Sequence, residues 1–197
     1  MATVVSVSRS VVVSMLAETL TLTTVEGSYD ATLAGVLSRP GWKRIGFEAS
    51  HVTVTRFRGL EHSLARGAHV PELVPMDGLV ELARSVKDAY EIQVFRAAGR
   101  LLSKVTEQVL GFARPGVSER DLALEIDTAI RRAGFEKPAF ETIVASGPHA
   151  ALPHARPTER TLGEGDLVVL DFGGVYDSYC VDLTRTVVVG PPSPRAL

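Results

Sequence analysis

Apolar residues recur every three to four positions over a long stretch in the middle of the chain. This spacing places them on one face of an α-helix that begins near Lys87; they are Ile92, Phe95, Leu101, Leu102, Val105, Val109 and Phe112. Pro115-Gly116 ends the pattern. Ser118 then opens a second helical stretch, with an acidic residue three positions later as in a capping box, and Gly134 closes it. We expect both helices to pack on a core and to carry their charges on a solvated face.

Before this helical zone, runs of β-branched residues alternate with turns. A helix is predicted over Tyr29–Leu37, where Arg39-Pro40-Gly41 ends it, and a strand follows at Arg44–Phe47. The alternation is typical of a small α/β domain. The histidines of this region are isolated and share no ligand spacing, so we expect no catalysis from it.

The last third of the chain has the pattern of a β-hairpin with an aspartate on each arm. The apolar run Leu167–Leu170, typical of a buried strand, ends in Asp171, and a second strand-like run contains Asp182. With a turn centred on Tyr176-Asp177, Asp171 would lie directly opposite Asp182, with Cβ atoms roughly 4.5–5.5 Å apart. Carboxylates that close repel one another unless a cation lies between them, and a metal pair about 3.5–4 Å apart would fit there. The alternative is a solvated hairpin without metal.

Composition and charge exclude some classes of partner. A chain of 197 residues can hold one large or two small domains, and its 45% hydrophobic and 22% charged residues are ordinary for a globular protein. With a net charge of −2 the chain has no excess of basic residues, so we expect no nucleic-acid partner. No run approaches the ~18 apolar residues of a membrane helix, so we expect no membrane partner. Cys180 is the only cysteine, which favours a reducing, cytoplasmic compartment.

Three separate segments of the last third resemble the pita-bread metallopeptidases (M24-type) in their order and spacing. They are GPHAALPH at 147–154, GDLVVLDFG at 165–173 and DLTRT at 182–186. Within this family the similarity is greatest to Xaa-Pro aminopeptidases and Xaa-Pro dipeptidases. The resemblance implies an α+β fold in two parts. Residues 84–197 would form the N-terminal half of the pita-bread metallopeptidase domain. Residues 1–83 would form part of a small α/β creatinase-like N-terminal domain.

The resemblance also implies a metal site and a reaction. The family holds two divalent metal ions, most often Mn²⁺ or Co²⁺ with Zn²⁺ possible, between two aspartates, a histidine and two glutamates. Asp171 and Asp182 match the two aspartates, including the eleven-residue interval between them. His154 matches a catalytic histidine outside the metal shell, which contacts the substrate and helps to stabilise the transition state. Thr184 is expected to orient a ligand carboxylate, whereas His149 is expected to have only a role within its loop. The implied reaction is cleavage of Xaa-Pro bonds, at peptide N-termini or in dipeptides, by a water that two metals activate.

The remaining ligands of the family have no match in this sequence. In the family the other histidine and both glutamates lie beyond the position of Leu197. We therefore expect this chain to be truncated and inactive alone, and the resemblance implies a proline-containing peptide as substrate and a homodimer. Two alternatives stay open. One is a non-catalytic relative that binds a peptide or a partner chain. The other is a creatinase-like amidinohydrolase, which the aspartate pair disfavours. Sequence alone does not choose between aminopeptidase and dipeptidase, or between metals.

Overall fold

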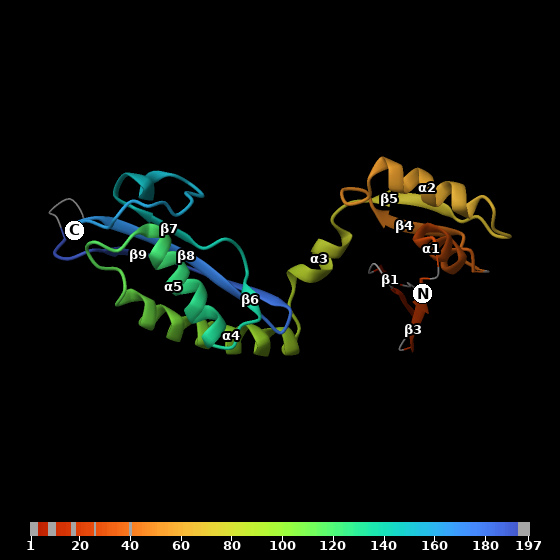
Figure 1. Ribbon diagram of the computed structural model, residues 1–197. Coiled ribbons are helices and arrows are strands. Elements are labelled where there is room, and N and C mark those ends of the chain that lie inside the picture. The colour runs from red at the N-terminus through yellow and green to blue at the C-terminus, as the bar shows by residue number, and fades with distance from the viewer. Residues whose placement is uncertain (1–3, 8–10, 17–18, 26, 40, 193–197) are drawn as a thin grey trace. The chain divides into compact units, whose positions relative to one another are not determined.

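The computed structural model of the protein describes residues 4–7, 11–16, 19–25, 27–39 and 41–192. The chain forms two compact units, residues 1–86 and 87–197 (Figure 1). Of the helices within the described ranges, none has the length and apolar character that a membrane span needs.

The first unit combines two small sheets with helices. Its elements, in chain order, are β1 (Val4–Val7), β2 (Val11–Leu16), β3 (Thr19–Thr24), α1 (Tyr29–Leu37), β4 (Arg44–Glu48), α2 (Val54–Leu64), β5 (Glu72–Met76) and α3 (Leu79–Ser85). Strands β1, β2 and β3 form an antiparallel sheet in that order, and β4 pairs in parallel with β5. The predicted helix and strand are confirmed as α1 and β4. Ala34, Leu37 and Leu64 form a small buried cluster between α1 and α2.

Two long helices begin the second unit, as the apolar spacing predicts. Helix α4 spans Ala89–Leu110, and α5 spans Glu119–Arg132. A capping box starts α4, because Asp88 accepts from the Glu91 backbone N–H while the Glu91 carboxylate accepts from that of Asp88. The cap of α5 is simpler than predicted. The Ser118 hydroxyl oxygen accepts from the backbone N–H of Asp121, but its own O–H, rather than its backbone N–H, donates to the Asp121 carboxylate.

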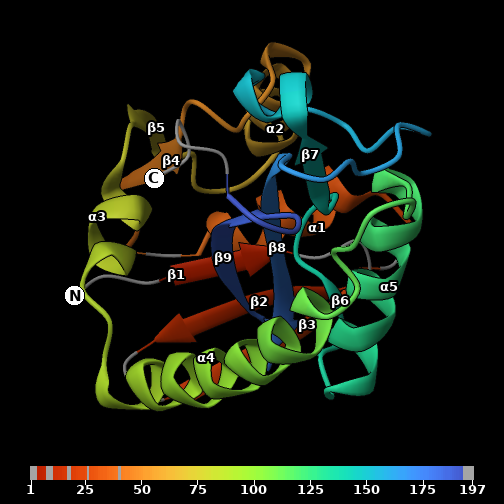
Figure 2. The same cartoon turned by 90° about the vertical axis from the view of Figure 1, so that its left-hand side faces the viewer.

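A four-stranded antiparallel sheet completes the second unit. Its elements are β6 (Lys137–Pro138), β7 (Ile143–Ser146), the 3₁₀ turn η1 (Gly147–Ala151), β8 (Leu167–Tyr176) and β9 (Tyr179–Val188). Strand β8 pairs with β6 and β7 along one edge and with β9 along the other. Helices α4 and α5 lie side by side against one face of this sheet (Figures 1 and 2).

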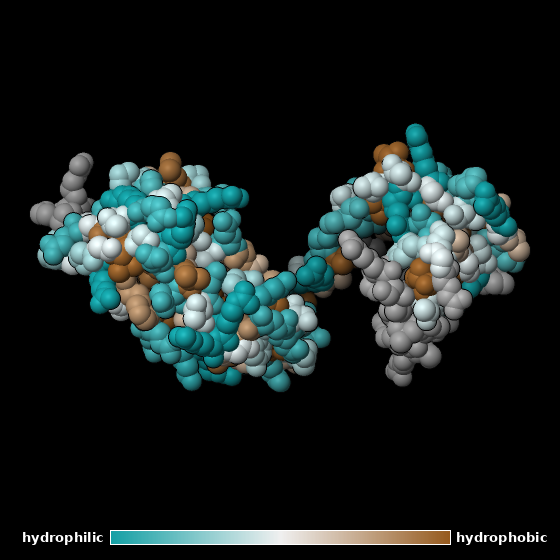
Figure 3. All heavy atoms as spheres, viewed as in Figure 1, coloured by the Kyte–Doolittle hydropathy of each residue, from teal (hydrophilic) through white to brown (hydrophobic). Residues whose placement is uncertain are grey.

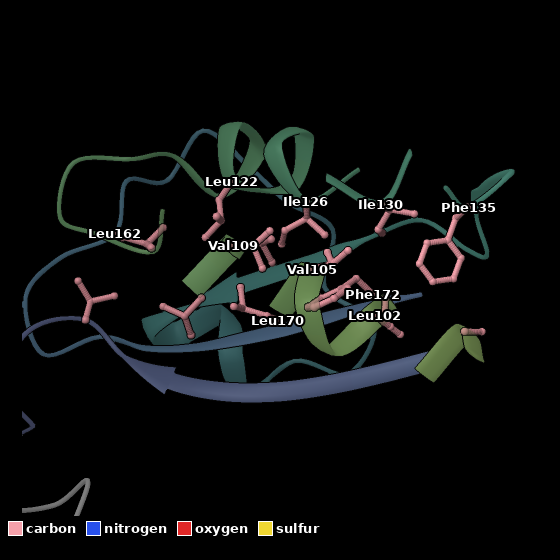
Figure 4. Close-up of a cluster of buried hydrophobic side chains, with 14 residues drawn as sticks. Leu102, Val105, Val109, Leu122, Ile126, Ile130, Phe135, Leu162, Leu170 and Phe172 are labelled. Carbon is pink, nitrogen blue, oxygen red and sulfur yellow. The ribbon is translucent and has the colours of Figure 1, made fainter. Parts of the chain in front are cut away.

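The core of the second unit lies between the two helices and that face of the sheet. The side chains of strand β8 alternate between the two faces of the sheet, and on the face toward the helices Val168, Leu170 and Phe172 are fully buried. The side chains of α4 and α5 meet them from the other side, as Figure 4 shows for Val105 and Ile126. Because successive strand residues point to opposite faces, the odd-numbered residues of β8 face away from the helices. Outside this core, hydrophobic residues on the visible face of each unit form only small patches among hydrophilic ones (Figure 3).

Candidate metal centre and the loop beside it

The hairpin between β8 and β9 has a different register from the one predicted. Its turn consists of Asp177 and Ser178, whose φ angles are 49° and 65°. Two successive positive φ values match a two-residue turn whose twist suits a β-hairpin. The turn therefore lies one residue later than Tyr176-Asp177, and Tyr176 pairs with Tyr179.

This register changes how the two aspartates meet. Asp171 lies opposite Thr184, and Asp182 lies opposite Gly173, so the prediction that the two aspartates face each other directly is wrong. The pairing differs from the predicted one by two residues, which is the period of side chains along a strand. Both aspartates therefore remain on one face, as diagonal neighbours, on the side of the sheet away from α4 and α5.

Asp171, Asp182 and His154 line the same open pocket, of about 540 Å³. Apolar side chains, among them Phe140 and Ile143, form part of its wall. A second pocket of about 360 Å³ is lined by Asp171 and His154 as well, together with the small apolar residues that follow Gly147. The structure thus gathers the three residues singled out in the sequence around one cavity on the face of the sheet that points away from α4 and α5.

The two carboxylates form an environment that suits a cation. Thr184 Oγ1 donates to Asp171 Oδ1 at 2.8 Å, so this hydroxyl orients the carboxylate as expected. Partial burial raises the pKa of the Asp182 carboxyl, and the neighbouring Asp171 carboxylate raises it further. A divalent cation between the two would remove that repulsion, and carboxylate oxygen is a ligand that hard divalent metals favour. In the described part of the chain no group of three or more His, Cys, Asp or Glu side chains is placed to hold a metal. The residues present therefore fit part of a metal ligand set.

His154 lies on an exposed loop that leaves the sheet after β7. Its φ of 56° is in the left-handed region, which is uncommon for a residue other than glycine. A backbone in this conformation persists only where the surroundings hold it.

A buried carboxylate that the sequence analysis missed lies beside this loop. Glu119, in the first turn of α5, is fully buried (0% exposed), although we expected the charges of this helix on a solvated face. It accepts from Ser146 N at 2.8 Å and Oγ at 2.7 Å, and from Thr158 N at 3.0 Å and Oγ1 at 2.7 Å. His149 Nδ1 lies 3.0 Å from the same carboxylate. The polar partner of His149 is therefore a residue of α5, outside the loop that carries His149.

These contacts keep Glu119 ionised in spite of its burial. Burial by itself would raise the pKa of the Glu119 carboxyl, but hydrogen bonds from Thr158, Ser146 and His149 outweigh it and lower the pKa to about 2. An acidic residue in the first turn of a helix is ordinary in a sequence, because it suits the helix dipole. The sequence therefore carried no signal that this residue, unlike Asp121, points inward.

An ion pair extends the same cluster. Arg160 Nη1 donates to Asp166 Oδ2 at 2.7 Å and to Ser146 Oγ at 2.5 Å, which leaves the Ser146 O–H directed at Glu119. Gly147 follows Ser146 with a φ of 51°, and a Cβ there would lie 2.6 Å from Arg160 Nη2. The loop thus starts at a position that only glycine fills without displacing this ion pair.

Both units of the chain match known protein families. Residues 93–197 match the model of metallopeptidase family M24, and residues 3–86 match that of the creatinase/prolidase N-terminal domain. The chain is 36% identical over 169 residues to an uncharacterized peptidase of Bacillus subtilis, covering 86% of this chain and 47% of that protein. It is 34% identical over 155 residues to an Xaa-Pro dipeptidase of Pyrococcus horikoshii, covering 79% of this chain and 43% of that protein. The chain thus spans somewhat less than half the length of these relatives.

Solved structures give the same assignment. An Xaa-Pro dipeptidase from Bacillus anthracis superimposes with a TM-score of 0.85 at 30% identity, over 96% of this chain and 57% of that one. An X-Pro aminopeptidase from Thermotoga maritima gives a TM-score of 0.81 at 27% identity, over 94% of this chain and 57% of that one. The resemblance found in the sequence and the partial pita-bread fold are confirmed. With a family model covering more than half of its residues, this chain belongs to metallopeptidase family M24.

Proposed function

We propose that this chain supplies part of the active site of an Xaa-Pro exopeptidase. Asp171 and Asp182 would contribute carboxylate ligands to a divalent metal centre, and His154 would contact the substrate. The observation that carries this proposal is the convergence of these three side chains on one pocket. Relatives named as Xaa-Pro dipeptidase and X-Pro aminopeptidase support the same class of substrate, a peptide or dipeptide with proline in second position.

Each residue of the pocket has a task that its chemistry allows. When bound, divalent metals supply Lewis acidity and lower the pKa of a water molecule. Asp171 and Asp182 hold negative charge at the pocket wall, and the Thr184 hydroxyl fixes the orientation of the Asp171 carboxylate. His154 would donate a hydrogen bond to the substrate carbonyl oxygen, where charge develops as the peptide bond is attacked. The apolar wall at Phe140 and Ile143 would accommodate the ring of a proline residue.

Metal binding is the first test, and it uses the 197-residue chain. Mn²⁺ is titrated into the protein and free Mn²⁺ is followed by electron paramagnetic resonance. Two carboxylates alone hold a divalent ion weakly, so we expect weak binding that both Asp171→Asn and Asp182→Asn remove. Asp77→Asn, at an exposed position of the first unit, is the matched control and should bind as the unchanged chain does. Binding that survives both site variants would contradict the metal assignment.

Hydrolysis is tested in a chimera that joins this chain to the part of the Bacillus anthracis Xaa-Pro dipeptidase that it does not cover. We expect Mn²⁺-dependent cleavage of Xaa-Pro dipeptides or of peptides that begin Xaa-Pro. Asp171→Asn or Asp182→Asn should abolish it, whereas His154→Ala should lower kcat and leave the metal content nearly unchanged. Full activity in either aspartate variant would contradict the site, and loss of metal in His154→Ala would make His154 a ligand. A folded, metal-loaded chimera without hydrolysis would favour a peptide-binding relative.

The cellular location, the oligomeric state and the identity of the metal are further proposals. We infer a cytoplasmic location, because the exposed free thiol of Cys180 suits a reducing compartment. We also infer a homodimer, which sedimentation of the chimera would test. Manganese or cobalt is the metal we expect in the complete centre, and metal analysis of the purified chimera would identify it.

A further inference from the structure

Glu119 has no task in the mechanism proposed above, yet its contacts are arranged around the loop that carries His154. Its carboxylate accepts from both the backbone and the side chain of Ser146, the last residue before the loop. It accepts in the same two ways from Thr158, the first residue after the loop. The Glu119 carboxylate therefore bridges the two ends of the 147–157 loop, which the pairing of Ser146 with Val168 and a hydrogen bond from Arg120 N to Thr158 O also hold.

The interior of the loop is tied to the same point. His149 Nδ1 contacts both oxygens of the Glu119 carboxylate, at 3.0 and 3.1 Å. His154 is five positions after His149 and four before Thr158, so it lies between two residues that Glu119 holds. Within the loop, Gly147–Ala151 form the 3₁₀ turn η1, and Leu152 N donates to His149 O at the end of this turn. His154 follows this turn, so the contacts of Glu119 with His149 before it and with Thr158 after it bear on where His154 lies.

The cluster can be satisfied only by an ionised acceptor at position 119. The Ser146 and Thr158 groups that reach this carboxylate include backbone N–H groups, which can only donate. The Ser146 O–H is committed to Glu119, because Arg160 occupies the oxygen of that hydroxyl as a donor. A glutamine at this position would bring its own N–H₂ against donors and leave buried polar groups without partners.

We propose that Glu119 is a positioning residue, whose buried carboxylate ties the two ends of the 147–157 loop together and thereby holds His154 at the pocket with Asp171 and Asp182. The functional meaning of this tie rests on the role proposed for His154. The tie itself requires no metal and no substrate, so it is tested separately from hydrolysis. Its consequence is that a residue which never touches the substrate determines where His154 lies.

The test compares Glu119→Gln with Glu125→Gln in the 197-residue chain. Both variants remove one negative charge from α5, but Glu125 is exposed on this helix. Hydrogen exchange by mass spectrometry should show peptides over residues 146–158 exchanging roughly tenfold faster or more in Glu119→Gln. Peptides from α4 and β8 should keep their protection relative to Glu125→Gln, whereas a general loss of stability would raise exchange everywhere.

A second readout follows His154 itself. Its imidazole signal in a ¹H–¹⁵N spectrum, assigned with His154→Gln, should shift or broaden in Glu119→Gln and stay unchanged in Glu125→Gln. His154 is not one of the hydrogen-bond partners of Glu119, so a change at His154 reports movement of the loop. Unchanged exchange over residues 146–158, or an unchanged His154 signal, overturns the proposal.

A milder variant keeps the test decisive if Glu119→Gln does not fold. Thr158→Val removes one of the hydroxyl donors to Glu119 and keeps the size and branching of the side chain. We expect roughly threefold faster exchange, confined to residues 146–158. No change there would equally overturn the proposal.

Discussion

Two acidic environments in the second unit show how differently one fold treats a carboxylate. Glu119 is fully buried and surrounded by donors, and its pKa falls to about 2. Asp182 is exposed, yet the pKa of its carboxyl is raised, first by partial burial and then by the carboxylate of Asp171 that it faces. Burial acts to raise the pKa of both carboxyls, so the opposite directions of the two shifts come from the charge and hydrogen-bonding character of their neighbours.

This difference in surroundings separates a carboxylate with a structural role from one that is suited to bind a cation. Glu119 has its hydrogen-bonding capacity filled by Ser146, His149 and Thr158, so nothing further is needed to stabilise its charge. Asp171 accepts from the hydroxyl of Thr184 and Asp182 from the backbone of Leu183, but neither donor is charged, so the two negative charges stay uncompensated by these contacts. This contrast supports a cation at the aspartates and no ligand at Glu119.

The largest change in the free energy of unfolding should come from removing the charge at Glu119. We expect Glu119→Gln to lower the free energy of unfolding at pH 7 by about 3 kcal/mol, because charge-assisted hydrogen bonds are lost and buried donors lose their acceptor. Urea unfolding followed by circular dichroism measures it. Glu125→Gln should stay within about 0.5 kcal/mol of the unchanged chain. A similarly small effect of Glu119→Gln would remove the distinction between the two environments.

Acid pH should remove the difference in unfolding free energy between the unchanged chain and Glu119→Gln. The pKa of Glu119 in the folded chain, about 2, is lower than its ordinary value of 4.5. Its contribution is therefore fully present above about pH 4.5 and is lost as the pH falls toward 2. The gap in unfolding free energy between the unchanged chain and Glu119→Gln should narrow by about 3 kcal/mol over this window. A gap that is constant from pH 6 to pH 2.5 would mean that the ionised form is not what stabilises the fold.

The smallest effect is expected at the aspartate pair in the absence of metal. Asp182→Asn removes a charge that repels Asp171, so the unfolding free energy at pH 7 should rise slightly or stay within about 0.5 kcal/mol. The measurement is urea unfolding in a chelating buffer, with Asp77→Asn as the control. A loss comparable with that of Glu119→Gln would show that Asp182 is structural, and would weaken its assignment as a metal ligand.

Much of the second unit could be predicted from local sequence. The three-to-four spacing of apolar residues predicted α4 and α5, since it is the repeat of a helix that buries one face. In the first unit, by contrast, α2 was not predicted, because Leu64 alone among its residues is buried and the sequence offers little periodicity. A helix that buries one residue leaves almost no pattern to detect.

The chain by itself determined that Asp171 and Asp182 share a face of one hairpin, because side chains alternate along a strand and a shift of two residues preserves the face. Which residues pair across it was decided by the turn at Asp177 and Ser178, which takes positive φ angles without the Asn-Gly or Asp-Gly pair that signals such a turn in a sequence. Tertiary structure alone turned Glu119 inward, because its donors Ser146 and Thr158 are 27 and 39 positions away in the sequence. Periodicity records which face of an element is buried, whereas a polar cluster exists only where distant segments meet.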